Sequence, residues 1–210
     1  RCDSGFSFFF DLIRQEWTGN NCAPPHRICT LMRKMGVRSF VREELAPNQE
    51  ILDEQQAAAT RTGGSVQAKA IRLTFFRSNP SSGSWRDVPD DDALGYAVIV
   101  TLALPAGPQR SFVLESVVRT PSIWVPSQSR LVEPQSITNY YVHCSRDCET
   151  TVGTAGAKRT FRLRGSFFCQ QNDLTHVCAH AALRTAINSS PTFVGQKLTN
   201  KLINDVLGID

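Results

Sequence analysis

A single cysteine, Cys178, stands where a polar segment gives way to a run of small apolar residues. The segment before it contains three amides, Gln170, Gln171 and Asn172, and residues 179–183 after it read Ala-His-Ala-Ala-Leu. This pattern predicts that Cys178 lies in the first turn of a helix. The N-terminus of a helix carries partial positive charge and unpaired N–H groups, which favour the thiolate form of a cysteine. The segment therefore indicates a nucleophilic thiol.

Residues 170–210 resemble the nucleophile region of papain-like cysteine peptidases. The resemblance is carried by the amides at 170–172, the Cys-Ala-His-Ala-Ala-Leu segment at 178–183, a proline break and a second short helix ending near Gly208. It is closer to the bacterial bacteriocin-processing-like peptidases than to papain. It implies an α+β fold in which an antiparallel or mixed sheet packs on a buried helix that carries the nucleophile.

The resemblance also implies a reaction. Cys178 would attack an amide or ester carbonyl and form an acyl-thioester, as in a peptidase or amidase. The side chain of Gln171, together with the backbone N–H of Cys178, would stabilise the oxyanion. In papain the glutamine lies six residues before the cysteine. Here that position is Asn172, and Gln171 and Gln170 lie seven and eight residues before Cys178. Which of the three amides would stabilise the oxyanion is therefore left open. The implied partner is a peptide or protein substrate, and no cofactor is needed.

The general base is the main departure from the family, in which a histidine follows the cysteine on the sheet. The last histidine here is His180, and its side chain would point about 200° away from that of Cys178 on the same helix. Three explanations are open: a histidine beyond Asp210, a circular permutation like that of lecithin retinol acyltransferase-like proteins, or an inactive relative. In the permuted case His143, at the end of an apolar strand, is the best candidate, and His26 beside two prolines is weaker.

Two other classes of function compete with catalysis. One is a structural zinc site, because cysteines and histidines are most concentrated between residues 143 and 180: His143, Cys144, Cys148, Cys169, His176, Cys178 and His180. The paired Cys-x-x-Cys spacing of zinc knuckles is missing from this set, which weakens that interpretation. The other is a catalytically inactive interaction or regulatory module with the same fold.

Composition restricts the class of protein. The chain has 210 residues, a net charge of +4 and 41% hydrophobic residues, as in ordinary globular proteins. No apolar run reaches 18 residues, so we expect no membrane partner. The basic residues at 158–164 lack interleaved aromatic residues on their face, so we expect no nucleic-acid partner. Seven cysteines without the spacing of a disulfide framework favour a cytoplasmic location, and the oligomeric state is left open.

The elements that would position Cys178 follow from periodicity and turn residues. Residues 1–60 are predicted to be mainly helical, residues 61–65 (Arg-Thr-Gly-Gly-Ser) to be a flexible joint, and residues 66–210 to be β-rich and then helical. Helices are expected at 6–17, 27–35, 47–60, 178–187 and 199–207. Strands are expected at 37–43, 71–76, 96–104, 110–118, 138–144 and 158–168, with 96–104 and 110–118 forming an antiparallel hairpin.

Overall fold

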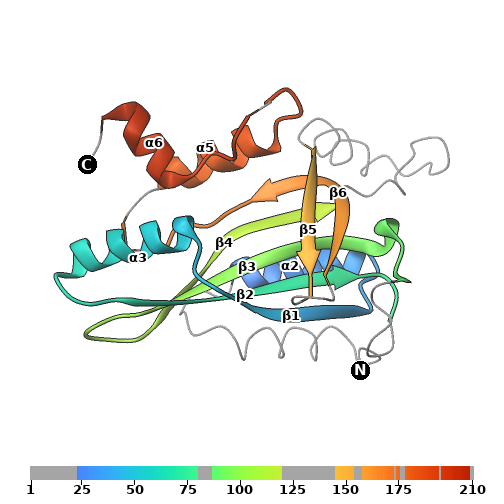
Figure 1. Cartoon of the computed structure of the whole chain (residues 1–210), viewed down its shortest axis with the longest axis horizontal. Helices are drawn as coiled ribbons and strands as arrows, with labels where there is room; N and C mark the ends of the chain where they lie inside the picture. The colour runs from blue at the N-terminus through green and yellow to red at the C-terminus, as the bar shows by residue number, and fades with distance from the viewer. Residues whose placement is uncertain are drawn as a thin grey trace.

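The computed structural model describes residues 23–79, 87–119, 145–153, 158–172, 174–175, 178–193 and 195–208. They form an α+β fold built on one six-stranded sheet, in the order β1-β2-β3-β4-β6-β5, in which every strand pairs with its neighbours antiparallel (Figure 1). The strands are β1 (Ser39–Leu45), β2 (Gln67–Phe76), β3 (Ala93–Ala103), β4 (Arg110–Arg119), β5 (Arg146–Val152) and β6 (Arg159–Phe168). The helices are α2 (Ala23–Lys34), α3 (Gln49–Thr62), α5 (Cys178–Ser189) and α6 (Asn200–Leu207), with a 3-10 turn η2 at Asp90–Asp92.

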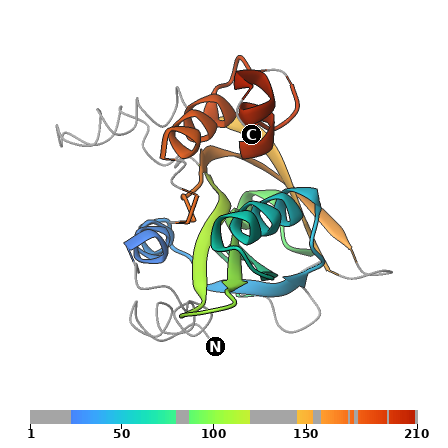
Figure 2. The ribbon, with the colours of Figure 1, turned by 90° about the vertical axis from the view of Figure 1, so that its left-hand side faces the viewer.

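Successive side chains of a strand point to opposite faces of the sheet, and the central strands carry apolar side chains on both faces. One helix therefore covers each face. On one face, Ile28 and Met32 of α2 pack in the same cluster as Leu73 of β2. On the other face, Ile51 and Ala58 of α3 pack in a cluster with strand residues such as Val98 and Val100. Figure 2 shows α2 and α3 on opposite sides of the central strands.

A β-bulge interrupts the pairing of β3 with β4. Val98 pairs with Glu115, but the next residue, Ile99, pairs with Val113, so Leu114 is the extra residue on β4. A bulge places two successive side chains on nearly the same face of a sheet. Leu114 and Glu115 therefore both face the side that α3 covers, and both line one pocket there.

Local signals set the ends of the helices. Asn48 caps α3 by accepting a hydrogen bond from the Ile51 backbone N–H, and Thr199 caps α6 by accepting one from Leu202. The expected stop at Gly208 is confirmed, because this residue has a φ of 63° and its N–H donates to the Asn204 carbonyl. The expected joint at 61–65 begins with the end of α3, where Gly63 has a φ of 67°.

The sheet joins the two regions expected from the sequence. β1 lies before residue 61 and pairs along its whole length with β2, which lies after residue 65. The expected hairpin of 96–104 with 110–118 is confirmed as β3 and β4. The expected helix at 6–17 and strand at 138–144 lie outside the described residues. No strand was expected at β5, a largely polar strand that pairs with β6 at the edge of the sheet.

Candidate functional site

Cys178 is the first residue of α5, as the sequence predicted, and its side chain is exposed. The thiol donates to Oε1 of Gln171 across 2.7 Å. The two residues are seven apart in the chain, and Gln171 comes from the segment that follows β6. The structure thus places together two of the three residues that the resemblance singled out.

The two neighbouring amides are engaged elsewhere. The backbone N–H of Gln170 donates to the Val113 carbonyl at 2.8 Å, and its side-chain Oε1 accepts from the Val113 N–H at 3.3 Å, so Gln170 extends the sheet beside β4. Asn172 is buried; its Nδ2 donates to Glu54 at 2.7 Å and its Oδ1 accepts from the backbone of Leu174 and Thr175. Of the three amides at 170–172, Gln171 is therefore the one whose side chain contacts the thiol.

The histidines lie in different surroundings. His143, the proposed base, lies outside the described residues, as does His176. His180 points toward α6, where its Nε2 is 2.7 Å from Oδ1 of Asn204. His26 belongs to α2 and is exposed.

A ladder of polar contacts holds α5 antiparallel to the segment that contains α6. His180 meets Asn204 and Arg184 meets Asn200, so a step of four residues on α5 matches a step of four on α6. Asn188 continues the ladder by donating to the Leu198 carbonyl at 3.0 Å and accepting from the Leu198 N–H at 2.9 Å. The expectation that His180 and Arg184 share one side of the helix is confirmed.

A buried ion-pair cluster attaches α5 to the rest of the fold. Arg184 is 1% exposed, and its guanidinium pairs with Glu50 of α3 and donates to the Leu114 carbonyl of β4 at 3.3 Å. Lys197 bridges Glu50 and Glu115, with its Nζ 2.5 Å from one carboxylate oxygen of each. We call these four charged residues (Arg184, Glu50, Lys197 and Glu115) the Arg184 cluster. They connect three elements that are far apart in the sequence.

Burial shifts the ionisation of groups around the cluster. Burial raises the pKa of the Glu54 carboxyl above its ordinary value, although hydrogen bonds from Asn200 and Asn172 act against this shift. Burial acts to lower the pKa of Lys197, but Glu115 and Glu50 more than offset it, so this pKa is raised and the ammonium keeps its charge. The positive charge that bridges the two carboxylates is therefore stable at neutral pH.

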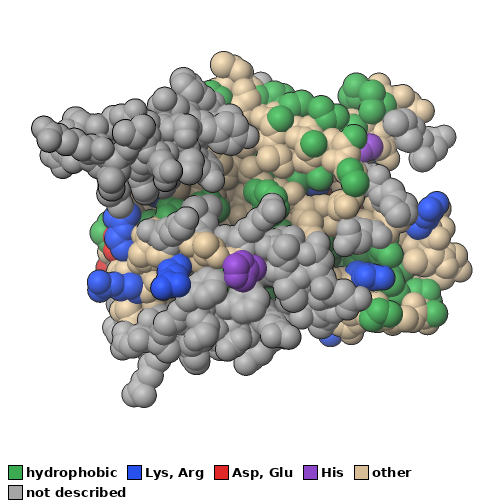
Figure 3. All heavy atoms as spheres, turned by 180° about the vertical axis from the view of Figure 1, so that it is seen from behind, with side chains coloured by type: hydrophobic (Ala, Val, Ile, Leu, Met, Phe, Trp, Pro, Cys, Tyr) green, Lys and Arg blue, Asp and Glu red, His purple; other side chains and the backbone are tan. Residues whose placement is uncertain are grey.

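The expectation that α5 is a buried helix is wrong. Its buried residues are Arg184, Asn188 and Ser189, whereas its small apolar residues at 179, 182 and 186 are exposed and Leu183 is 43% exposed. The helix lies beside β6, where the Ser189 side chain bonds to the backbone of Phe167. Only this side of α5 packs against the rest of the described residues. Figure 3 shows hydrophobic side chains gathered on the outer surface of the region of α5 and α6.

The described cysteines separate by burial. Burial raises the pKa of the Cys29 thiol to about 12 and also raises the pKa values of Cys148 and Cys169. Cys178 is the exposed thiol of the four described. Within the described part of the chain, no group of three or more histidine, cysteine or acidic side chains has the arrangement of a metal site, so the zinc interpretation gains no support there.

No protein-family model matches the chain, and no curated protein or solved structure is significantly similar to it. None of the helices described is both long and apolar enough to cross a bilayer.

Replacing Arg184 by methionine should lower the free energy of unfolding by about 3 kcal/mol, because the substitution leaves Glu50 and Glu115 buried with a single countercharge. Denaturant unfolding of the purified variant measures this change. Arg162→Met is the matched control: its ion pair with Glu149 is exposed and 3.7 Å long, so its loss should cost about 0.5 kcal/mol or less. Equal costs for the two variants would contradict the assigned role of the cluster.

Glu54 should make stability fall as pH rises. The folded protein holds the Glu54 proton more tightly than the unfolded chain does, so the stability that Glu54 contributes is fully present below the ordinary pKa of 4.5 and is lost as pH rises through the raised folded-state pKa. Glu54→Gln should flatten this decline in urea unfolding measured from pH 4 upward. The exposed Glu44→Gln should leave it intact, and parallel curves for wild type and Glu54→Gln would refute the assignment.

Proposed function

We propose that this protein is a thiol-dependent peptidase or amidase of the papain-like type, which acts on peptide or protein substrates through an acyl-thioester on Cys178. The observation that carries the proposal is the contact between the exposed Cys178 thiol, at the first position of α5, and the Gln171 side chain. An exposed thiol and an amide meeting at a helix N-terminus provide a nucleophile and oxyanion donors in one place.

The reaction would use these groups in order. The sulfur of Cys178 attacks the substrate carbonyl carbon, and the carbonyl oxygen takes up negative charge. Backbone N–H groups in the first turn of a helix lack intrahelical acceptors, so the Cys178 N–H is available to donate to that oxygen. Rotation of the Gln171 amide brings its Nε2 donors to the same oxygen. The amine then departs with a proton, and water hydrolyses the thioester.

His143 is our proposed proton acceptor. The described strands all precede α5 in the chain, which is the order that a permuted papain-like arrangement requires. In such an arrangement the base comes from a segment before the nucleophile, as His143 does. The described histidine nearest to the thiol in sequence, His180, is already paired with Asn204 of α6.

Alkylation tests the thiol directly. Iodoacetamide at near-neutral pH should modify Cys178 faster in the folded protein than in the urea-unfolded chain, because folding holds the exposed sulfur at the open start of a helix, beside N–H groups that lack intrahelical acceptors. Cys29, Cys148 and Cys169 should show the opposite order, because folding buries Cys29 and Cys169 and partly buries Cys148. Peptide mass spectrometry gives each rate. A Cys178 that reacts no faster when folded than when unfolded would contradict the proposal.

Hydrolysis tests the assigned roles. On a library of fluorogenic peptide amides, Cys178→Ala should abolish turnover, and Gln171→Ala should lower kcat by about 10²-fold with little change in KM, because its amide acts in the transition state. His143→Ala should also lower kcat, whereas Gln67→Ala, at an exposed end of β2, should have no effect. An active Cys178→Ala would overturn the proposal, and a reactive thiol without turnover of any substrate would favour an inactive relative.

A further inference from the structure

The chain on either side of Gln171 is held at two points. Gln170 continues the sheet beside β4 through its two hydrogen bonds to the Val113 backbone. Asn172 is 3% exposed, and its Nδ2 donates at 2.7 Å to Oε2 of Glu54, a residue of α3 that lies 118 positions earlier in the sequence. Gln171 therefore stands between one anchor on the sheet and one on α3, and its own side chain contacts the thiol.

Asn172 shapes the chain that leads to Cys178. Its Oδ1 accepts from the backbone N–H groups of Leu174 and Thr175, each at 2.9 Å, and from the Thr175 hydroxyl at 3.0 Å. Asparagine side chains form turns in this way, by bonding to the backbone a few residues further along the chain. With Oδ1 engaged inside the turn, the Asn172 side chain reaches the rest of the fold through Nδ2, and Glu54 accepts that bond.

Glu54 joins the two segments that flank α5. Its second oxygen, Oε1, accepts at 2.5 Å from Nδ2 of Asn200, the first residue of α6. Asn200 in turn accepts from Arg184 of α5. The Glu54 side chain is buried, so these amide donors take the place of water around its carboxyl group. One side chain of α3 thus contacts both the segment that precedes Cys178 and the helix that packs beside α5.

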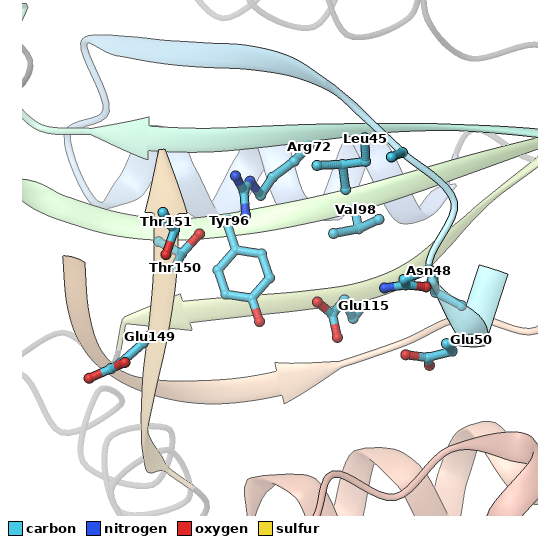
Figure 4. A pocket seen from close by; sticks show the side chains of 12 residues that line it. Leu45, Asn48, Glu50, Arg72, Tyr96, Val98, Glu115, Glu149, Thr150 and Thr151 are labelled. Atoms are coloured by element: carbon cyan, nitrogen blue, oxygen red, sulfur yellow. The ribbon is translucent and has the colours of Figure 1, made fainter. Parts of the chain in front are cut away.

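The neighbouring carboxylates of α3 have other partners. Glu50, one turn earlier, is held by the Arg184 cluster and lines a pocket together with Glu115 of β4 (Figure 4). Asp53 accepts a hydrogen bond from within α3 itself. Among the described residues of α3, Glu54 is therefore the acceptor that Asn172 uses.

We propose that Glu54 is a positioning residue for the Cys178 site: through Asn172 it holds the turn that sets Gln171 beside the thiol. This role rests on the proposed function, because the placement of Gln171 affects a rate only if its amide stabilises an oxyanion. Loss of the Glu54 acceptor leaves the Asn172 N–H groups buried without a partner, and the turn then opens toward water. Gln171 is adjacent to Asn172 and moves with it, and a displacement of about 1 Å can lower a catalytic rate by about 10²-fold.

Hydrogen exchange in two Glu54 variants tests the hold on the turn. Leucine in Glu54→Leu cannot accept a hydrogen bond, whereas the carbonyl oxygen in Glu54→Gln can still accept from Asn172, and the half-buried Asn200 can rotate to accept from the new amide. In Glu54→Leu the backbone N–H groups of Leu174 and Thr175 should exchange at least about tenfold faster by NMR, because the turn opens more often. Glu54→Gln should keep the slow exchange. Unchanged exchange in Glu54→Leu would overturn the proposal.

Turnover of the peptide amides by the same variants tests the consequence for catalysis. Glu54→Leu should lower kcat by about tenfold with little change in KM, because Gln171 acts in the transition state, and Glu54→Gln should keep most of the wild-type kcat. Met32→Ala is the stability control: it removes a core side chain on the face that α2 covers, and neither kcat nor exchange at the turn should change. Normal kcat in Glu54→Leu despite fast exchange would overturn the positioning role and leave the peptidase proposal standing. A wild type without turnover would overturn the peptidase proposal, and the exchange rates would still decide whether Glu54 holds the turn.

Discussion

The pairing of the buried Arg184 guanidinium with Glu50 is the constraint on which the placement of the candidate nucleophile depends. A charge that is 1% exposed requires a countercharge and hydrogen-bond acceptors, and Arg184 finds them on α3, β4 and α6. Because α3 and β4 pack together in the core of the sheet, the pairing fixes α5 against that core. Cys178, six residues earlier on the same helix, is thereby held at a defined position beside the end of β6.

Signals that act over a few residues could be predicted from the sequence. The hairpin of β3 and β4, the cap at Thr199 and the stop at Gly208 all depend on short patterns of side chains and on glycine conformation. The start of α5 at Cys178 and its contact with Gln171 are of the same kind, because only seven residues separate the two side chains. Short-range patterns in the sequence therefore located the two described residues of the candidate site, Cys178 and Gln171.

Features set by distant partners could not be predicted in this way. An alanine-rich run forms a helix equally well when it is exposed, so composition did not show that α5 has one buried face and that this face is polar. β5 reads Arg-Asp-Cys-Glu-Thr-Thr-Val, and such an edge strand lacks a strong apolar alternation. Arg184 and Glu50 are 134 residues apart, and no pattern in the sequence relates them.

The bulge at Leu114 divides β4 into two stretches of opposite parity. Before it, even-numbered residues such as Phe112 face α3; after it, odd-numbered ones such as Val117 do. Strict alternation along β4 would turn either Leu114 or Glu115 to the opposite face of the sheet, so the bulge is what keeps an apolar side chain and a carboxylate together on the side that α3 covers.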